Sequence, residues 1–345
     1  MIRCLHEFRA NFNRAIPLAL AAMLFAAEAA AADSAAFIMY HRFGEDAYPS
    51  TSISVAQFDA HLAELKSGPY TVLPVQEILA AMRAGKALPD RTVGITIDDA
   101  YLSVFTQAWP RLRKAGLPFT LFVATQPIDN GAKNYMSWDQ IRAMRDAGVT
   151  IGSQSETHLH MAEANEAQNR RDLQRSQDRF KAVLGEAPTL FAYPYGEASS
   201  ATRKFVIEQG FIAAFGQHSG IADRTGDAFF IPRFAFNDRY GAISRFRQRV
   251  NALALPVSGI TPADPLIEAA NPPAFGFSVD ATVSKLDRLA CYHSQFDKVT
   301  VERLGSARFE IRFAAPLKRG RSRLNCTVPG PDKRYRWFGW QFYVK

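Results

Sequence analysis

In the stretch VGITIDDAY, residues 93–101, a mostly apolar run is followed by two adjacent carboxylates. Its first half, residues 93–97, predicts a buried strand, and Asp98 and Asp99 follow at the carboxyl end of that strand. Adjacent side chains on extended backbone point in different directions, so one carboxylate can bind a metal while the other faces a substrate. An aspartate pair that merely caps the following helix is the alternative interpretation.

Outward from this stretch, apolar runs alternate with helical patterns. The predicted strands cover residues 37–40, 119–123, 149–152, 190–193 and 212–215, and the predicted helices cover residues 55–66, 105–115, 138–147 and 163–184. This alternation predicts an α/β fold in which a parallel sheet is covered by helices. If the sheet closes like a barrel, functional residues are expected at the carboxyl ends of its strands.

The N-terminal residues have the layout of a secretory signal peptide. Arg3, Arg9 and Arg14 precede an apolar run at residues 15–27, and small residues then lead to Ala32. An uncleaved membrane anchor is the alternative. We therefore expect residues 1–32 to be removed, with the mature protein exported to the periplasm or outside and no transmembrane segment remaining. The net charge of +8 is interpreted as a basic, soluble surface, and no nucleic-acid partner is expected.

The composition changes after residue 252. Prolines accumulate in residues 253–274, which we interpret as a linker or extended wrap between an α/β region of residues 33–252 and a small β-rich region of residues 275–345. Short apolar runs separated by turns predict strands in this last region. Cys291 and Cys326 are the pair that remains after signal cleavage, and an oxidising compartment favours a disulfide between them. Aromatic residues crowd residues 335–343, where core packing is preferred over stacking on sugars.

Two further segments carry polar chemistry after predicted strands. Residues 152–160, GSQSETHLH, contain His158 and His160, and imidazole is the usual ligand of zinc and related ions. Residues 191–196, FAYPYG, end a strand in a turn, and the backbone N–H groups of Tyr195 and Gly196 are candidates to hold a developing oxyanion. A surface histidine pair and an ordinary turn are the alternatives.

Taken together, residues 96–100, 152–158 and 191–196 resemble the NodB-homology polysaccharide deacetylase family, carbohydrate esterase family 4. The pair Tyr40-His41 resembles the periplasmic poly-N-acetylglucosamine deacetylase branch. The resemblance covers roughly residues 35–238. It implies a distorted (β/α) barrel of the NodB type, here with a C-terminal β-rich appendage, and a divalent metal cofactor, zinc or else cobalt, nickel or manganese.

The resemblance also implies a role for each matching residue. Asp98 is expected to be the general base, His41 the general acid and the Tyr195 N–H the oxyanion donor. The expected metal ligands are Asp99 and His158, with Gln154 or His160 as the third. The expected substrate contacts are Tyr101, Tyr193 and Pro194.

This chain departs from the family pattern at three positions. Ala100 replaces a glycine, which we expect to be a mild change. Ala192 replaces an arginine that orients the catalytic aspartate, and we hypothesise that Arg233 supplies the missing charge. Gln154 replaces the first metal histidine. Either Gln154 binds a metal weakly, or His160 substitutes, or the site binds no metal and is inactive.

The predicted function is metal-dependent hydrolysis of acetamido groups on an N-acetylglucosamine-containing poly- or oligosaccharide. The first alternative is a catalytically weak glycan-binding or export accessory protein on the same scaffold. The second is a hydrolase for a different amide or ester. The sequence does not specify the glycan linkage or the oligomeric state.

Overall fold

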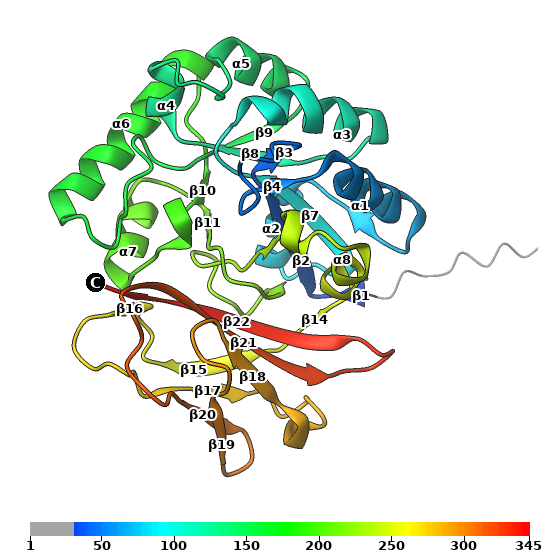
Figure 1. The fold of residues 1–345 in the computed structure, drawn as a ribbon, viewed down its shortest axis with the longest axis vertical. Coiled ribbons are helices and arrows are strands. Elements are labelled where there is room, and N and C mark those ends of the chain that lie inside the picture. The colour runs from blue at the N-terminus through cyan, green and yellow to red at the C-terminus, as the bar shows by residue number, and fades with distance from the viewer. Residues whose placement is uncertain (1–30) are drawn as a thin grey trace, which may run out of the picture.

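The computed structural model describes residues 31–345, so the predicted signal peptide lies outside the described residues except for its last two positions. A helix-covered sheet forms one part of the molecule and a β-rich region forms the other (Figure 1). The helices are α1 Val55–Ser67, α2 Val75–Arg83, α3 Trp109–Ala115, α4 Thr125–Asp129, α5 Trp138–Asp146, α6 Glu166–Leu184, α7 Ser200–Glu208 and α8 Ile243–Val250.

The central sheet is parallel and follows the order β11-β10-β9-β8-β7-β2. These strands are β2 Ser34–Tyr40, β7 Thr92–Ile97, β8 Thr120–Val123, β9 Thr150–Ser153, β10 Leu190–Ala192 and β11 Ala213–Phe215. All the strands predicted in this half are present. The predicted helices are present too, with two differences. The helix predicted at residues 105–115 consists of a π-helical segment, Val104–Ala108, followed by α3. Helix α6 begins three residues late because the Asn165 side chain caps it.

One short segment curls the sheet toward closure. Ile231 bridges to Phe215 of β11, and β13 (Phe234–Ala235) pairs with β2 at the opposite edge. Arg233 lies between these two contacts. The antiparallel β12 (Ala222–Asp223) also pairs with β2, and β5 (Thr71–Val72) joins β7. The α/β barrel-like fold class is thus confirmed.

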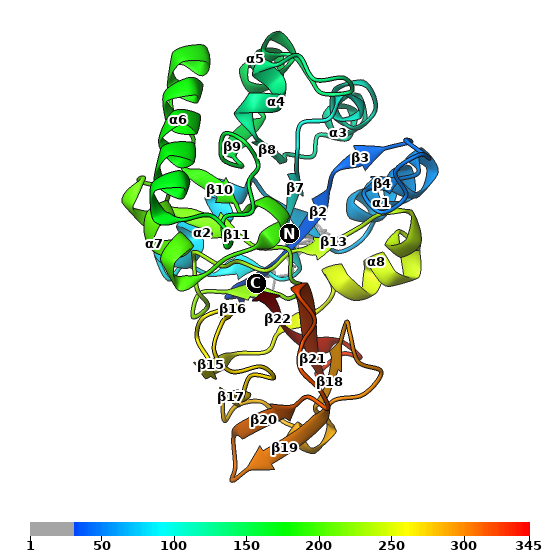
Figure 2. The same cartoon turned by 60° about the vertical axis from the view of Figure 1, so that its left-hand side comes forward.

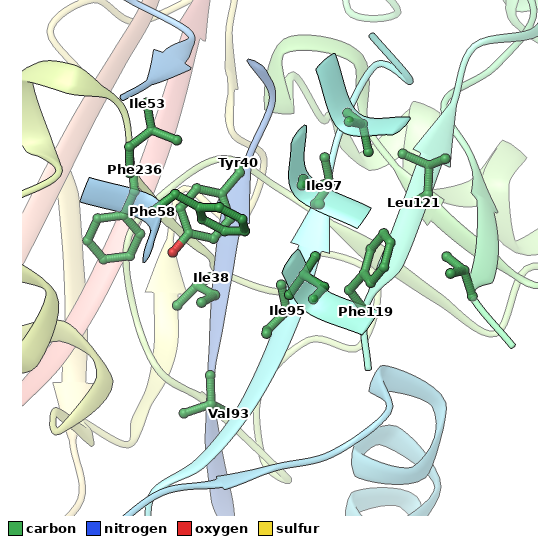
Figure 3. Packing of buried hydrophobic residues seen from close by; sticks show 14 of the residues in the cluster. Ile38, Tyr40, Ile53, Phe58, Val93, Ile95, Ile97, Phe119, Leu121 and Phe236 are labelled. Carbon is green, nitrogen blue, oxygen red and sulfur yellow. The ribbon is translucent and has the colours of Figure 1, made fainter. Parts of the chain in front are cut away.

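Alternate residues of the strands face two different cores. Ile38, Tyr40, Val93, Ile95 and Ile97 pack outward against the helices (Figure 3). The intervening positions face inward.

The inner core contains the rings of Phe37, Phe122 and Phe215. A Cβ on Gly94 would lie 2.5 Å from the Phe37 ring, and one on Gly152 would lie 2.4 Å from the Phe122 ring. These two glycines leave room for large rings inside the narrow sheet.

The C-terminal region contains one mixed and one antiparallel sheet, because β14 and β16 run parallel to β22 in the first. One has the order β14-β22-β21-β18, with β16 also beside β22, and the other has the order β15-β17-β20-β19. The strands are β14 Leu253–Ala254, β15 Val257–Thr261, β16 Leu266–Ile267, β17 Phe275–Val279, β18 Ala290–His293, β19 Thr300–Leu304, β20 Arg308–Arg312, β21 Gly320–Pro329 and β22 Tyr335–Val344.

Residues 253–274, which we interpreted as a linker or extended wrap, contribute β14, β15 and β16 to these sheets and are not a free linker, because their backbone pairs with β17 and β22. The expected disulfide joins Cys291 on β18 to Cys326 on β21, at directly paired positions. The aromatic run on β22 is mostly buried, as preferred from the sequence.

The β21–β22 hairpin lies where the β-rich region meets the barrel (Figure 2). The approach is close: a Cβ on Gly339 would lie 1.8 Å from the Ser219 carbonyl oxygen. Only glycine allows β22 to reach the loop after β11 at this point. Within residues 31–345, no helix has both the length and the apolar character that a membrane crossing requires.

Candidate active site

Asp98 follows β7, and its carboxylate is bound by Arg233. The Nη1 and Nη2 groups of Arg233 donate to the two carboxylate oxygens at 2.7 and 2.8 Å, and both side chains are fully buried. The arginine is itself fixed, because its Nε donates to the Gly216 carbonyl at 2.9 Å and its Nη1 donates to Thr96 Oγ1 at 3.1 Å. This bidentate pair holds the Asp98 carboxylate in one orientation and balances its charge.

The position of Arg233 agrees with the hypothesis drawn from the sequence. The strand-like segment from Ile231 to β13 closes the barrel, so its middle residue points inward. The guanidinium lies over the rings of Phe122 and Phe215, 5.5 and 5.6 Å from their centroids. Burial among aromatic rings removes competing water, which strengthens the pairing with Asp98.

His41 follows β2 directly and faces the same carboxylate. Its Nε2 lies 4.0 Å from Asp98 Oδ2, and its side chain is partly exposed. The carboxyl ends of the neighbouring strands β2 and β7 therefore bring together the predicted acid and the predicted base.

Asp99 and His158 form the second pair of the site. Their Oδ1 and Nε2 atoms are 3.4 Å apart, and neither atom has a hydrogen-bond partner within residues 31–345 although both are buried. Burial raises the pKa of the Asp99 carboxyl, but His158, the charge on His41 and the Tyr101 hydroxyl outweigh it and lower that pKa to about 2. The carboxylate is thus available as a ligand at neutral pH.

Left-handed backbone directs these side chains. Asp99 and Ala100 have φ values of +74° and +50°, and Ser155 and His158 have values of +69° and +56°. Such values are unfavourable for residues with a Cβ, which explains the family preference for glycine at position 100. The Ala100 replacement therefore carries backbone strain, contrary to our expectation of a mild change.

The loop that carries His158 is anchored by Asp172 of α6. One oxygen of the Asp172 carboxylate accepts the Glu156 N–H at 2.9 Å, and the other accepts the Thr157 N–H and hydroxyl at 3.1 and 2.6 Å. Three hydrogen bonds to one buried carboxylate compensate for the irregular backbone. The loop is thereby held rigidly enough to position His158.

Gln154 is fully buried beside Asp99, and its amide is oriented toward the Asp99 backbone. Its Oε1 accepts the Asp99 backbone N–H at 3.1 Å, and its Nε2 has no partner within the described residues. Reversing the amide would place two donors against each other at Asp99. One lone pair of the oxygen that we predicted as a weak metal ligand is thus used by the Asp99 N–H, and the Nε2 group without a partner within residues 31–345 is a donor, which cannot bind a metal.

The residues present fit only part of a metal site. Zinc-type bonds of about 2.0–2.1 Å at tetrahedral angles separate two ligand atoms by about 3.3 Å, close to the spacing of Asp99 Oδ1 and His158 Nε2. Within residues 31–345, however, no three His, Cys, Asp or Glu side chains gather into a metal-binding group. Two candidate ligands are present where a catalytic zinc site usually has three.

His160 does not take the place of the missing ligand. Its Nδ1 is hydrogen-bonded to Glu197 Oε2 at 2.8 Å, and its ring stacks on Tyr195 with centroids 4.1 Å apart. Nearly half of the His160 side chain is exposed, whereas Glu197 is buried. Because a buried carboxylate holds its Nδ1, His160 faces the rim of the site. Our alternative of His160 as a metal ligand is therefore not supported.

The turn after β10 carries the predicted oxyanion donor. Tyr195 has a φ of +58°, and the Gly196 N–H donates to the Tyr193 carbonyl at 2.8 Å. Gly196 is thus unavailable as a second donor, and the Tyr195 N–H remains the candidate. Tyr193 is fully buried and donates to the Phe229 carbonyl, while Pro194 is also buried. Those two predicted substrate contacts are structural residues instead.

Tyr101 lies in an aromatic cluster beside Asp99. The Arg42 guanidinium lies 3.4 Å from the centroid of the Tyr101 ring and 4.0 Å from that of Tyr48, and the Tyr135 ring lies 4.8 Å from Tyr101. Tyr48 is exposed. The cluster places aromatic rings next to the candidate residue Asp99.

Sequence reasoning missed Asp172, Glu197 and Gln341, all of which support the site. Asp172 is a polar residue on the inner face of α6, and this position is the only sequence feature that could have indicated its supporting role. Glu197 and Gln341 act across separations that no local pattern reveals.

Comparison with known proteins identifies relatives of one kind. A sequence model of the family described as polysaccharide deacetylase matches residues 85–214. A poly-β-1,6-N-acetyl-D-glucosamine N-deacetylase of Staphylococcus aureus is 26% identical over 201 residues, which cover 54% of this chain and 68% of the relative.

Solved structures share the barrel. IcaB from Ammonifex degensii is 26% identical with a TM-score of 0.56, and the match covers 64% of this chain and 98% of that one. The deacetylase PplD of Streptococcus pyogenes, solved with acetate, has a TM-score of 0.59 at 19% identity, covering 63% and 98%, and shows similarity of fold. More than a third of this chain thus lies outside each structural match.

Proposed function

We propose that this chain, whose residues 85–214 match the polysaccharide deacetylase model, is a member of that family and hydrolyses acetamido groups on an N-acetylglucosamine-containing poly- or oligosaccharide. The products are acetate and a free amine on the glycan. The carrying observation is the gathering of His41, Asp98, Asp99 and His158 at the carboxyl ends of three strands, with Asp98 fixed by Arg233.

Each residue has a chemical role in this proposal. Asp98 accepts a proton from the attacking water, whose oxygen bonds to the acetamido carbon. Arg233 occupies one side of each carboxylate oxygen and leaves lone pairs free for this transfer. The Tyr195 N–H donates to the oxyanion that forms. His41 gives its proton to the departing nitrogen as the C–N bond breaks.

We propose a divalent metal as the partner of Asp99 and His158. Bound there, such an ion would polarise the substrate carbonyl and acidify water. With two protein ligands, it would be held more weakly than in a site with three. Zinc is the first candidate because imidazole and carboxylate are its ordinary ligands, and cobalt, nickel and manganese follow.

Export to the periplasm or beyond is part of the proposal. The N-terminal pattern of charges and apolar residues supports it, and so does the Cys291–Cys326 disulfide, because disulfides persist in oxidising compartments. A surface polymer is accessible in such a location.

A specific observation favours a second candidate function. Gln154 directs an amide donor, rather than a ligand atom, away from the Asp99 backbone. A chain with only two ligands can retain glycan binding while losing turnover. The second candidate is therefore a glycan-binding or export accessory protein with weak or no catalysis.

One experiment separates the two candidates. The mature protein is stripped of metal, zinc, cobalt, nickel or manganese is added back, and acetate release from N-acetylglucosamine oligomers is measured. Metal-dependent release that disappears in Asp98→Asn supports the deacetylase. No release with any metal, together with oligomer binding measured by calorimetry and activity gained in Gln154→His, rejects the deacetylase in favour of the binding protein.

A further inference from the structure

The β21–β22 hairpin contacts the barrel at the turn that carries the predicted oxyanion donor. Gln341 of β22 is buried, and its Nε2 donates to the Gly196 carbonyl at 2.7 Å and to the Tyr195 carbonyl at 3.3 Å. The hairpin thus binds two consecutive carbonyls of a turn that belongs to the barrel, some 145 residues earlier in the chain.

The orientation of the Gln341 amide is unambiguous. Its Oε1 accepts from Arg323 Nε on the neighbouring strand at 3.1 Å, so its NH₂ group must face the turn. Arg321, two residues before Arg323, adds a bond from Nη1 to the Tyr195 carbonyl at 3.2 Å and lies 3.4 Å from Glu197 Oε1. Both strands of the hairpin therefore supply donors to the turn.

The turn needs such support because its backbone is unfavourable. Tyr195 has a φ of +58° although it carries a large side chain, and Gly196 has a φ of +71°. A Cβ on Gly196 would lie 2.5 Å from the Gln217 backbone nitrogen, so the segment is also tightly packed. A left-handed tyrosine persists only when its surroundings hold it. The Tyr195 N–H shares its peptide with the Pro194 carbonyl, which accepts the Glu197 N–H at 3.1 Å. Gln341 and Arg321 bind the carbonyls of the two residues between these groups, so the hairpin fixes the backbone on which the orientation of that N–H depends.

We propose that Gln341 is a positioning residue that holds the Tyr195–Gly196 turn in the conformation required for oxyanion stabilisation, which makes the β-rich region part of the active site. This inference rests on the proposed deacetylase function. It concerns β22, which belongs to the β-rich region rather than to the barrel.

The test uses the full mature protein and measures kcat and KM for acetate release from an N-acetylglucosamine oligomer, with thermal unfolding measured in parallel. Gln341→Met keeps the volume and removes the donor, and it is expected to lower kcat about tenfold or more with KM within twofold. Gln341→Glu places an anion against two carbonyls and is expected to lower kcat further. Tyr343→Phe removes another hydrogen bond between the hairpin and the barrel, to Glu163, and is expected to leave kcat within twofold.

Wild-type kcat in a folded Gln341→Met protein overturns the proposal, as does an equal loss in Tyr343→Phe. If Gln341→Met does not fold, the partly exposed Arg321→Met decides. It is expected to lower kcat about threefold, whereas the matched Arg319→Met, which affects only the ion pair with Glu163, is not. Equal activity of those two variants then overturns the proposal.

If the wild-type protein releases no acetate, the proposed function fails on its own. A crystal structure of Gln341→Met then decides the positioning role. A Pro194–Tyr195 peptide that has turned, with a changed φ at Tyr195, supports it, and an unchanged peptide with an unchanged positive φ at Tyr195 overturns it.

Discussion

Arg233 donates to both carboxylate oxygens of Asp98 from 135 residues further along the chain, and neither side chain reaches solvent. The pair joins the segment that closes the barrel to the end of a central strand. A single contact therefore couples the closure of the fold to the orientation of the proposed base.

Replacing Arg233 tests this coupling. Arg233→Met leaves a buried carboxylate without its partner and is expected to destabilise the protein by about 3–5 kcal/mol in urea unfolding. Arg233→Lys retains the charge but cannot bind both oxygens in one plane, so a fall of about 100-fold in kcat is expected. Arg249→Lys is the matched control, because Arg249 is buried against Trp337 away from Asp98. Full activity in Arg233→Lys would show that bidentate pairing is not required.

Gln154→His tests the metal site without relying on turnover. A third imidazole beside Asp99 and His158 is expected to tighten zinc binding at least about tenfold, measured by calorimetry on metal-stripped protein. Gln154→Leu removes the amide without adding a ligand and is not expected to tighten binding. The idea of a two-ligand site fails if zinc binds the wild-type protein as tightly as the histidine variant.

His61 predicts an acid-sensitive stability. It is fully buried, its Nε2–H donates to the Gly241 carbonyl at 2.8 Å, and its Nδ1 accepts the Tyr40 hydroxyl at 2.9 Å. This arrangement needs the neutral ring, and burial lowers the pKa of His61 from 6.5 to about 4.

Because the folded pKa of His61 lies below the unfolded one, the unfolded state binds more protons between these values. The stabilisation is complete above pH 6.5 and is lost as the pH falls toward 4, by about 2 kcal/mol between pH 7.5 and pH 5. Urea unfolding of wild type and His61→Gln at both pH values measures this. The His61→Gln variant should show a smaller pH dependence, and an identical dependence in both proteins contradicts the assignment.

The Cys291–Cys326 disulfide is expected to stabilise the β-rich region. It spans 35 residues, for which loop entropy gives about 3–4 kcal/mol. A Cys291→Ser, Cys326→Ser double variant should therefore unfold at lower urea concentration than the oxidised wild type, whereas the reduced wild type should resemble the variant. Equal midpoints for all three proteins would show that the bond contributes little.

The sequence by itself determined the elements whose cause is local. The short run at residues 93–97 contains three β-branched apolar residues, which indicated a buried strand, so the carboxylates after it were expected at the strand end. The same reasoning found the strands before His41, Gln154 and Pro194. The parallel sheet followed from the alternation of strands and helices. Because Cys291 and Cys326 are the two cysteines that follow the predicted signal peptide, a disulfide between them was predicted.

Only the tertiary structure decided what depends on distant groups. Residues 253–274 are extended in either interpretation, and whether they form a linker or strands depends on β17 and β22 being alongside. The direction of the Gln154 amide depends on the Asp99 N–H, and the partner of His160 is Glu197 across a separate loop. Tyr193 fills the core because the Phe229 carbonyl lies within reach of its hydroxyl. Hydrogen bonds act over about 3 Å in space irrespective of separation along the chain, so their partners become known only when the chain is folded.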